Sequence, residues 1–72
     1  MGDLEFERHA RDEMARDTIS EDEAYQVISD ADVEIRQQNG HTRYERMMDN
    51  GRYIVVILDE KALTVKTVWW NK

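Results

Sequence analysis

Apolar positions recur at intervals of four near the start of the chain. Phe6, Ala10 and Met14 form a narrow apolar stripe. This spacing is typical of a helix that packs one face against a core. It predicts a first helix from Glu5 to Arg16.

A second helix is predicted by its start signal. Ser20 can cap the helix, and Glu23 stands three residues later, as in a capping box. Four apolar residues then follow the spacing i, i+3, i+4, i+7: Ala24, Val27, Ile28 and Ala31. We expect this helix to end near Ser29–Asp30.

From Val33 onward the apolar period changes from about four to two, which indicates strands. The predicted strands are Val33–Gln38, Thr42–Met48, Arg52–Leu58 and Leu63–Trp70. Three short turns join them, at Asn39-Gly40, Asp49-Asn50-Gly51 and Asp59-Glu60-Lys61. We therefore expect one α+β domain over residues 1–72, with two N-terminal helices packed on one face of a four-stranded antiparallel meander.

The third predicted strand is apolar on both faces, so its second face should be covered. Another copy of the chain or side chains of its own tail and loops could provide that cover. Trp69 and Trp70 point to opposite faces, and a large aromatic outside the core suits an interface. The interface residues that we predict are Tyr53, Val56, Trp69 and Trp70.

Charge is distributed unevenly along the chain. Residues 1–34 hold 12 acids and 3 bases, a net of −9, and residues 35–72 hold 4 acids and 7 bases, a net of +3; together they give the net charge of −6. An anionic partner should therefore meet the second half. The acidic balance fits either a protein from a high-salt cytoplasm or an ordinary acidic bacterial protein.

Composition narrows the classes of site. The chain has no Cys, its three Gly are isolated, and its two His do not share a metal-binding spacing. We expect no metal and no cofactor. No apolar run approaches the length of a membrane span, and the N-terminus is acidic where a signal peptide would be basic, so we expect a cytoplasmic protein without membrane contact.

His9 is the main candidate for chemistry. On a helix it lies beside the apolar stripe, near Glu13 and Arg16. His could transfer a proton and Arg could stabilise developing charge on a phosphodiester. The structural alternative is a half-buried His that packs the helix edge and bonds to the sheet. His41 follows Gly40 and is expected to be an exposed turn residue.

Basic and aromatic residues also alternate along the strands. The basic residues are Arg36, Arg43, Arg46, Arg52 and Lys66, and the aromatic ones are Tyr44, Tyr53 and Trp70. Such a mixture occurs on surfaces that bind single-stranded nucleic acid. Strand parity splits these residues between two faces, however, and the sequence pI is near 4.7. Cross-strand ion pairing is the alternative role, and RNA is a secondary candidate partner.

Several short motifs resemble a known family. His9-Ala10-Arg11, followed by Met14, Arg16 and Ile19 before an acidic second helix, is similar to the opening of the small prokaryotic domain of unknown function 4258. The segment Val65–Trp69 resembles the last strand of that family, and the likeness covers residues 6–69. The family often has Arg-Gly-Ile between its helices, whereas this chain has one residue more and no Gly there.

The resemblance implies a fold distantly like the toxin ribonucleases of the RelE and barnase type. It would place a site at His9 with Arg11 or Arg16 on the first helix and at Thr67 on the last strand. Two functions follow as expectations. The first is an interaction or accessory module without catalysis that binds a protein partner or itself through the second sheet face. The alternative is a toxin-like endoribonuclease of a toxin–antitoxin system that works through His9, Arg16 and Thr67.

Overall fold

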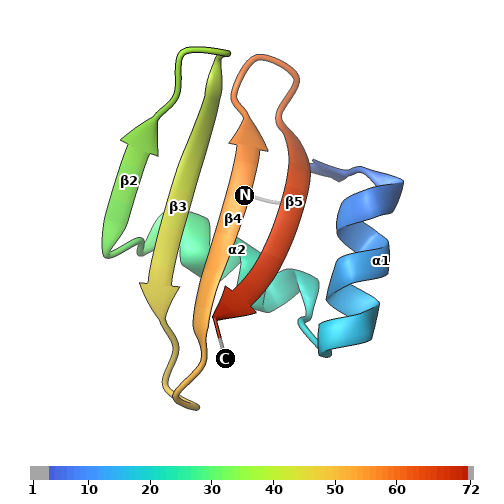
Figure 1. Cartoon of the computed structure of the whole chain (residues 1–72), viewed down its shortest axis with the longest axis vertical. Helices are drawn as coiled ribbons and strands as arrows, with labels where there is room; N and C mark the ends of the chain where they lie inside the picture. The colour runs from blue at the N-terminus through green and yellow to red at the C-terminus, as the bar shows by residue number, and fades with distance from the viewer. Residues whose placement is uncertain (1–3, 72) are drawn as a thin grey trace.

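Two helices and a five-stranded mixed sheet make up the computed structural model, which describes residues 4–71 (Figure 1). The helices are α1 (Arg8–Asp17) and α2 (Glu21–Ser29). The strands are β1 (Glu5–Phe6), β2 (Val33–Arg36), β3 (His41–Met47), β4 (Tyr53–Asp59) and β5 (Thr64–Asn71). The predicted α+β class with two helices is confirmed.

The sheet differs from the predicted one in composition. Its order is β1-β5-β4-β3-β2, in which β2 to β5 pair antiparallel while β1 pairs parallel with β5. A purely antiparallel four-stranded sheet was therefore wrong. The extra strand arises because Phe6 lies opposite Val65, and the N–H of Glu7 donates to the Val65 carbonyl at 3.0 Å.

The first helix is consequently shorter than predicted at its start. Phe6, Ala10 and Met14 are all buried, as the stripe predicts, but Phe6 is buried from an extended segment. The helix ends at Thr18, which adopts the left-handed conformation with φ 56°. The N–H of Ile19 then donates to the Met14 carbonyl at 2.8 Å and closes the helix end.

The second helix matches its start signal. The Ser20 hydroxyl accepts from the Glu23 N–H at 3.1 Å, and the Glu23 carboxylate accepts from the Ser20 N–H at 3.0 Å. This reciprocal pair is the predicted capping box, and the helix ends at Ser29 as expected.

Three turns connect the four long strands. Gly51 has a φ of 89°, in the left-handed region that favours glycine, and its N–H donates to the Met48 carbonyl at 2.9 Å, so the predicted turn at Asp49-Asn50-Gly51 is confirmed. At the first turn Gly40 has a φ of 86°. The hydrogen bond that closes this hairpin runs from the Gln37 N–H to the His41 carbonyl, so the loop has three residues instead of the predicted pair Asn39-Gly40. At the third turn, the Asp59 carboxylate accepts two backbone N–H groups, at 3.1 and 3.3 Å.

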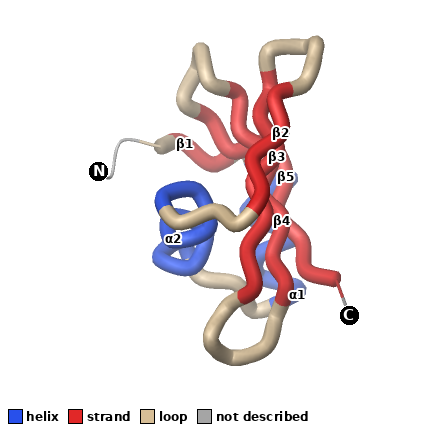
Figure 2. The backbone as a smooth tube through the Cα atoms, turned by 90° about the vertical axis from the view of Figure 1, so that its left-hand side faces the viewer, coloured by secondary structure: helices blue, strands red, loops and turns tan. Residues whose placement is uncertain are grey.

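The two helices lie differently against the sheet. α2 runs behind β3 and β4, and α1 lies beside β5 (Figures 1 and 2). The core between them contains Phe6, Ala10, Met14, Ile19, Ala24, Val27, Tyr44, Met48, Ile54, Val56, Leu58, Val65 and Val68. In residues 4–71 no helix covers the opposite side of the sheet.

Neither helix in the described part of the chain is both long and apolar enough to cross a membrane.

Candidate functional site

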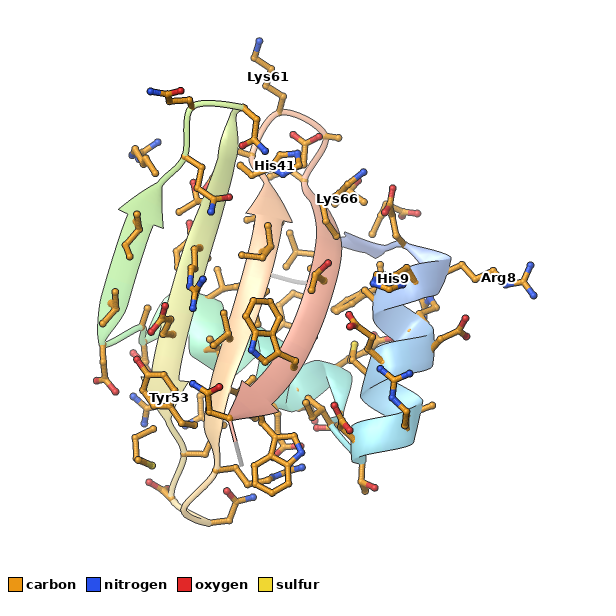
Figure 3. All side chains as sticks on the ribbon, in the orientation of Figure 1. Arg8, His9, His41, Tyr53, Lys61 and Lys66 are labelled. Carbon is orange, nitrogen blue, oxygen red and sulfur yellow. The ribbon has the colours of Figure 1, made fainter. Side chains whose placement is uncertain are left out.

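The side of the sheet that faces away from α2 is called the open face. Its members follow from the strand register, because Val55 of β4 lies opposite Glu45 and Trp69 while the next residue, Val56, belongs to the core. The open face consists of Val33, Ile35, His41, Arg43, Glu45, Met47, Tyr53, Val55, Ile57, Asp59, Thr64, Thr67, Trp69 and Asn71. Figure 3 shows Tyr53 and His41 at opposite ends of it.

A chain of polar contacts runs across the open face. The Tyr53 hydroxyl donates to Glu45 Oε1 at 2.5 Å, and Arg43 Nε donates to the other oxygen of the same carboxylate. The Arg43 guanidinium also lies 5.3 Å from the ring centre of Trp69. The charges of Arg43 and Glu45 therefore neutralise each other between two aromatic rings.

These contacts change the acidity of two groups. The hydrogen bond from Tyr53 lowers the pKa of Glu45; burial opposes this shift, and the hydrogen bond and charge of Arg43 support it. The same hydrogen bond, with burial, raises the pKa of Tyr53 above its ordinary value. The network is therefore most stable with Glu45 ionised and Tyr53 protonated.

The open face buries one residue without help from a helix. Val55 has no exposed surface, although it lies outside the main core cluster. Its cross-strand neighbours are Glu45 and Trp69, so side chains of the same sheet cover it. The two apolar faces of β4 thus do not require a second chain to bury Val55.

Other apolar side chains on this face stay accessible. Ile35 is 48% exposed and Met47 is 52% exposed. Both lie at the β2–β3 side of the sheet, where Ile35 pairs with Arg43 and Met47 pairs with Tyr53. The open face therefore offers exposed aliphatic groups beside the neutralised ion pair and its aromatic rings.

The four predicted interface residues are divided between the two sides of the sheet. Tyr53 and Trp69 lie on the open face. Val56 is fully buried against the helices, so it is not accessible to a partner. Trp70 packs against the core, with the Arg52 guanidinium 5.5 Å from its ring centre. Sequence parity separated the two tryptophans correctly but did not tell which one faces the helices.

The second candidate site is on α1. His9 Nε2 lies 3.5 Å from one oxygen of Glu13, and Arg16 lies 3.9 Å from the other. The Glu13 carboxylate also accepts the N–H of Val68 at 3.3 Å, which joins α1 to β5 directly after Thr67. The structure therefore gathers His9 and Arg16 around one carboxylate, and Thr67 lies on β5 directly before Val68. Figure 3 shows His9 on α1.

Burial of the two histidines differs from expectation. The His9 side chain is 67% exposed, so the expectation of a half-buried His bonded to the sheet was wrong; Glu13 makes the bond to the sheet instead. His41 begins β3 and is only 23% exposed, 3.9 Å from Asp59, so it is not a free turn residue. Cross-strand pairing with Asp59 draws it into the sheet.

Most of the basic residues on the sheet have carboxylate partners. Lys66 Nζ lies 2.5 Å from Glu7, and Arg52 Nη2 lies 2.8 Å from Glu23. Arg43 pairs with Glu45 and Arg36 with Glu34, each within its own strand. Ion pairing is thus the role of these four residues, although none of the pairs is cross-strand as predicted. Arg46 instead donates to the Asp30 carbonyl at 2.9 Å.

Two long-range contacts, one at the α1 site and one at the core side of the sheet, had no sequence signal. The Glu13–Val68 hydrogen bond joins residues 55 apart, and the Tyr44–Glu60 hydrogen bond, at 2.6 Å, joins residues 16 apart. Burial and the bond to Glu60 raise the pKa of Tyr44 well above its usual range. Within residues 4–71, no group of three or more His, Cys, Asp or Glu side chains could hold a metal ion.

Comparison of the chain with protein-family models, curated proteins and solved structures finds no match.

Proposed function

We propose that this chain is a protein-interaction or accessory module without catalysis, and that it binds through the open face. The observation that carries the proposal is the exposure of Ile35 and Met47 beside Tyr53 and Trp69 on a sheet side that no helix covers in residues 4–71. Exposed apolar groups next to aromatic residues are typical of protein-binding surfaces.

The electrostatics of the face agree with a protein partner better than with RNA. Arg43 is neutralised by Glu45, so it offers no free positive charge to phosphate. Trp69 and Tyr53 can serve as rigid anchors, because their neighbours hold both rings.

Affinity capture from cells of the source organism tests the proposal. The wild-type chain is compared with Met47→Lys, which places a charge on the open face, and with Ala15→Lys, which places the same charge on an exposed position of α1. We expect a specific protein, or the chain itself, to be retained by wild type and Ala15→Lys and lost by Met47→Lys. Equal retention by all three chains would contradict the proposal.

The second candidate function is a toxin-like endoribonuclease, in line with the family resemblance. It is supported by the gathering of His9 and Arg16 at Glu13, with both side chains more than half exposed and so accessible to a large substrate. His9 would transfer a proton, Arg16 would stabilise the charge that develops on phosphate, and Thr67 would contact the substrate from β5.

Growth and RNA-cleavage assays test this candidate. Expression of the chain should arrest host growth, and His9→Gln should abolish both cleavage and arrest while circular dichroism stays unchanged. His41→Gln is the matched control, since His41 lies on β3, two strands away from β5, and the substitution should leave cleavage intact. A chain that neither cleaves RNA nor slows growth would exclude the ribonuclease.

A further inference from the structure

We infer that the occupant of the open face is a second copy of this chain, packed face to face as a two-layer β-sandwich. This inference rests on the proposed function and names its partner. It is argued from the charge of the open face, the area that it offers and the position of its exposed apolar groups.

Charge gives the first step. The formally charged residues of the open face are Arg43, Glu45 and Asp59, which sum to −1 with His41 neutral. The whole chain carries −6, so the other surfaces hold −5. Two copies of so acidic a protein repel each other over most approaches. The open face is the nearly neutral surface through which they can meet at little electrostatic cost.

The same distribution argues against a strongly charged partner at this face. A basic protein or a nucleic acid would gain little from a surface on which Arg43 and Glu45 already satisfy each other. A contact between two identical faces, by contrast, brings together two ion pairs that are each neutral, so it adds little repulsion. The internal pairing of Arg43 with Glu45 therefore suits a contact between identical faces.

Area gives the second step. The strands β2 to β5 lie about 4.8 Å apart, and the central strands β3 and β4 each have seven residues with a rise of roughly 3.3 Å per residue. These dimensions give a face of roughly 19 by 23 Å, without the extra area that protruding side chains add. A standard interface removes about 800 Å² from each partner. The chain exposes 4552 Å² in all, so such an interface would use about a sixth of its surface. The flat area of roughly 440 Å², and less at β2 with its four residues, is below that of a standard interface, which indicates a weak and reversible dimer.

Packing gives the third step. Ile35 and Met47 are half-exposed on one side of the face, and Trp69 lies two strands away. A two-fold axis that lies between the two sheets, parallel to their strands, would set the aliphatic β2–β3 side of one copy against the Trp69 side of the other. Two sheets that stack in this way lie about 10 Å apart with interdigitated side chains.

The inference predicts an unusual response to salt. Repulsion between the acidic outer surfaces opposes the dimer and is screened as the Debye length falls from about 30 Å at 0.01 M to about 3 Å at 1 M salt. We expect the dimer to tighten by about tenfold or more over that range. A contact with an oppositely charged partner would weaken instead.

Sedimentation equilibrium of the wild-type chain at both salt concentrations is the experiment. We expect a monomer–dimer equilibrium that Met47→Lys weakens at least about tenfold, because the dimer would bury an unpaired charge. Ala15→Lys changes net charge by the same amount on the surface of α1, so it should leave the dimer intact or slightly tighter. If Met47→Lys weakens the dimer and Ala15→Lys does not, the contact lies on the open face.

A fluorescence measurement supplies an independent readout. In the Trp70→Phe variant the remaining tryptophan is Trp69. Its fluorescence emission should shift to the blue as the protein concentration rises, because the dimer would shield its ring from water. Adding Met47→Lys to the same chain should remove the shift. Both variants are first compared by thermal unfolding, and Met47, at 52% exposure, should tolerate the change.

The outcomes separate this inference from the proposed function. A monomer at every salt concentration, with a different protein captured through the open face, overturns the inference and leaves the proposed function standing. A monomer that captures nothing overturns both. A dimer that Met47→Lys does not weaken also overturns the inference, because the contact then uses another surface.

Discussion

Arg52 joins segments that lie far apart along the chain. Its guanidinium donates to the Asp17 carbonyl at the end of α1 at 2.9 Å and to the Glu23 carboxylate of α2 at 2.8 Å. It also lies over the ring of Trp70 in β5. Arg52 and Glu23 are only 18% and 22% exposed, so this pair is better shielded from water than most others in the molecule.

Replacing Arg52 should therefore be costly. We expect Arg52→Met, which keeps the apolar stem, to lower the free energy of unfolding by about 2 kcal/mol, because Glu23 and the Asp17 carbonyl lose charged hydrogen bonds. Arg36→Met is the matched control, since Arg36 is 77% exposed and lies 3.9 Å from Glu34. Its effect should be below about 0.5 kcal/mol. Urea unfolding of both variants checks the difference, and equal losses would contradict this role of Arg52.

Glu45 should make stability depend on acid pH. The hydrogen bond from Tyr53 lowers its pKa below the ordinary value of 4.5, against the effect of burial and with support from Arg43. As pH falls, the unfolded chain takes up this proton first. The stabilisation is therefore complete above about pH 4.5 and is lost as pH falls through the lower pKa of the folded state.

Glu45→Gln should remove this dependence. We expect the variant to be less stable than wild type at pH 7, and the difference to shrink at pH 3. Glu34→Gln, at a carboxylate that is 49% exposed, should follow the wild-type curve. Urea unfolding between pH 7 and pH 3 is the measurement, and a constant gap between Glu45→Gln and wild type would rule out the linkage.

At the scale of elements, the end of α1 carries a residue that does not favour its own conformation. Thr18 is β-branched and holds a φ of 56°, the left-handed region in which glycine is favoured. Its side chain is exposed. The Ile19 N–H that follows it closes the helix regardless of the side chain at position 18.

Thr18→Gly should therefore stabilise the chain, by about 0.5–1 kcal/mol. Ala15→Gly, inside the same helix, should destabilise it by a similar amount, because glycine there lowers helix propensity. Thermal unfolding of the two variants should move the midpoint in opposite directions. A loss of stability in both would show that the Thr18 side chain contributes a contact that outweighs the backbone strain.

The elements differ in how far the sequence predicts them. α2 was predictable because the capping box and the acidic first turn act locally. β1 was not, since two residues leave no period to detect, and Phe6 fits the stripe of α1 equally well. Its extended backbone depends on a hydrogen-bond partner, Val65, that lies 59 residues further along the chain.

The candidate sites were likewise predictable where the local pattern decides, and not where contacts between distant elements decide. Strand parity correctly set Trp69 apart from Trp70, and it correctly divided the basic residues of the strands between the two faces. The position of Trp70 against the core depends on which face α2 covers, and that is decided by packing between distant elements. The exposure of His9 was mispredicted because the bond to β5 is made one helical turn later, by Glu13.

At the scale of the whole molecule, the separation of charge along the chain becomes a separation in space. Residues 4–34 include both helices and hold most of the acids, whereas the strands and turns from residue 35 to 71 hold six of the nine basic residues in the described part of the chain. Pairs such as Glu7–Lys66 and Glu23–Arg52 attach one half to the other. The acids that lack such partners face water and repel one another.

We therefore expect salt to stabilise the fold. The melting temperature should rise by several degrees between 0.01 M and 1 M NaCl, because screening relieves repulsion among the carboxylates more than it weakens the few shielded pairs. Differential scanning calorimetry at low protein concentration, where the chain is monomeric, is the measurement. A melting temperature that does not change would remove the high-salt interpretation of the composition.

The way Glu13 occupies the edge of β5 also limits how the chain can assemble. On that side of the sheet, β1 pairs with the start of β5, and Glu13 takes up the Val68 N–H further along. The other side ends in β2, which pairs only with β3. A sheet that grows by adding strands needs a free edge on both sides, as a polymer needs monomers with two reactive ends. In residues 4–71 only the β2 edge is open along its whole length, so we expect edge pairing between copies to stop after a single addition rather than to continue into a fibre.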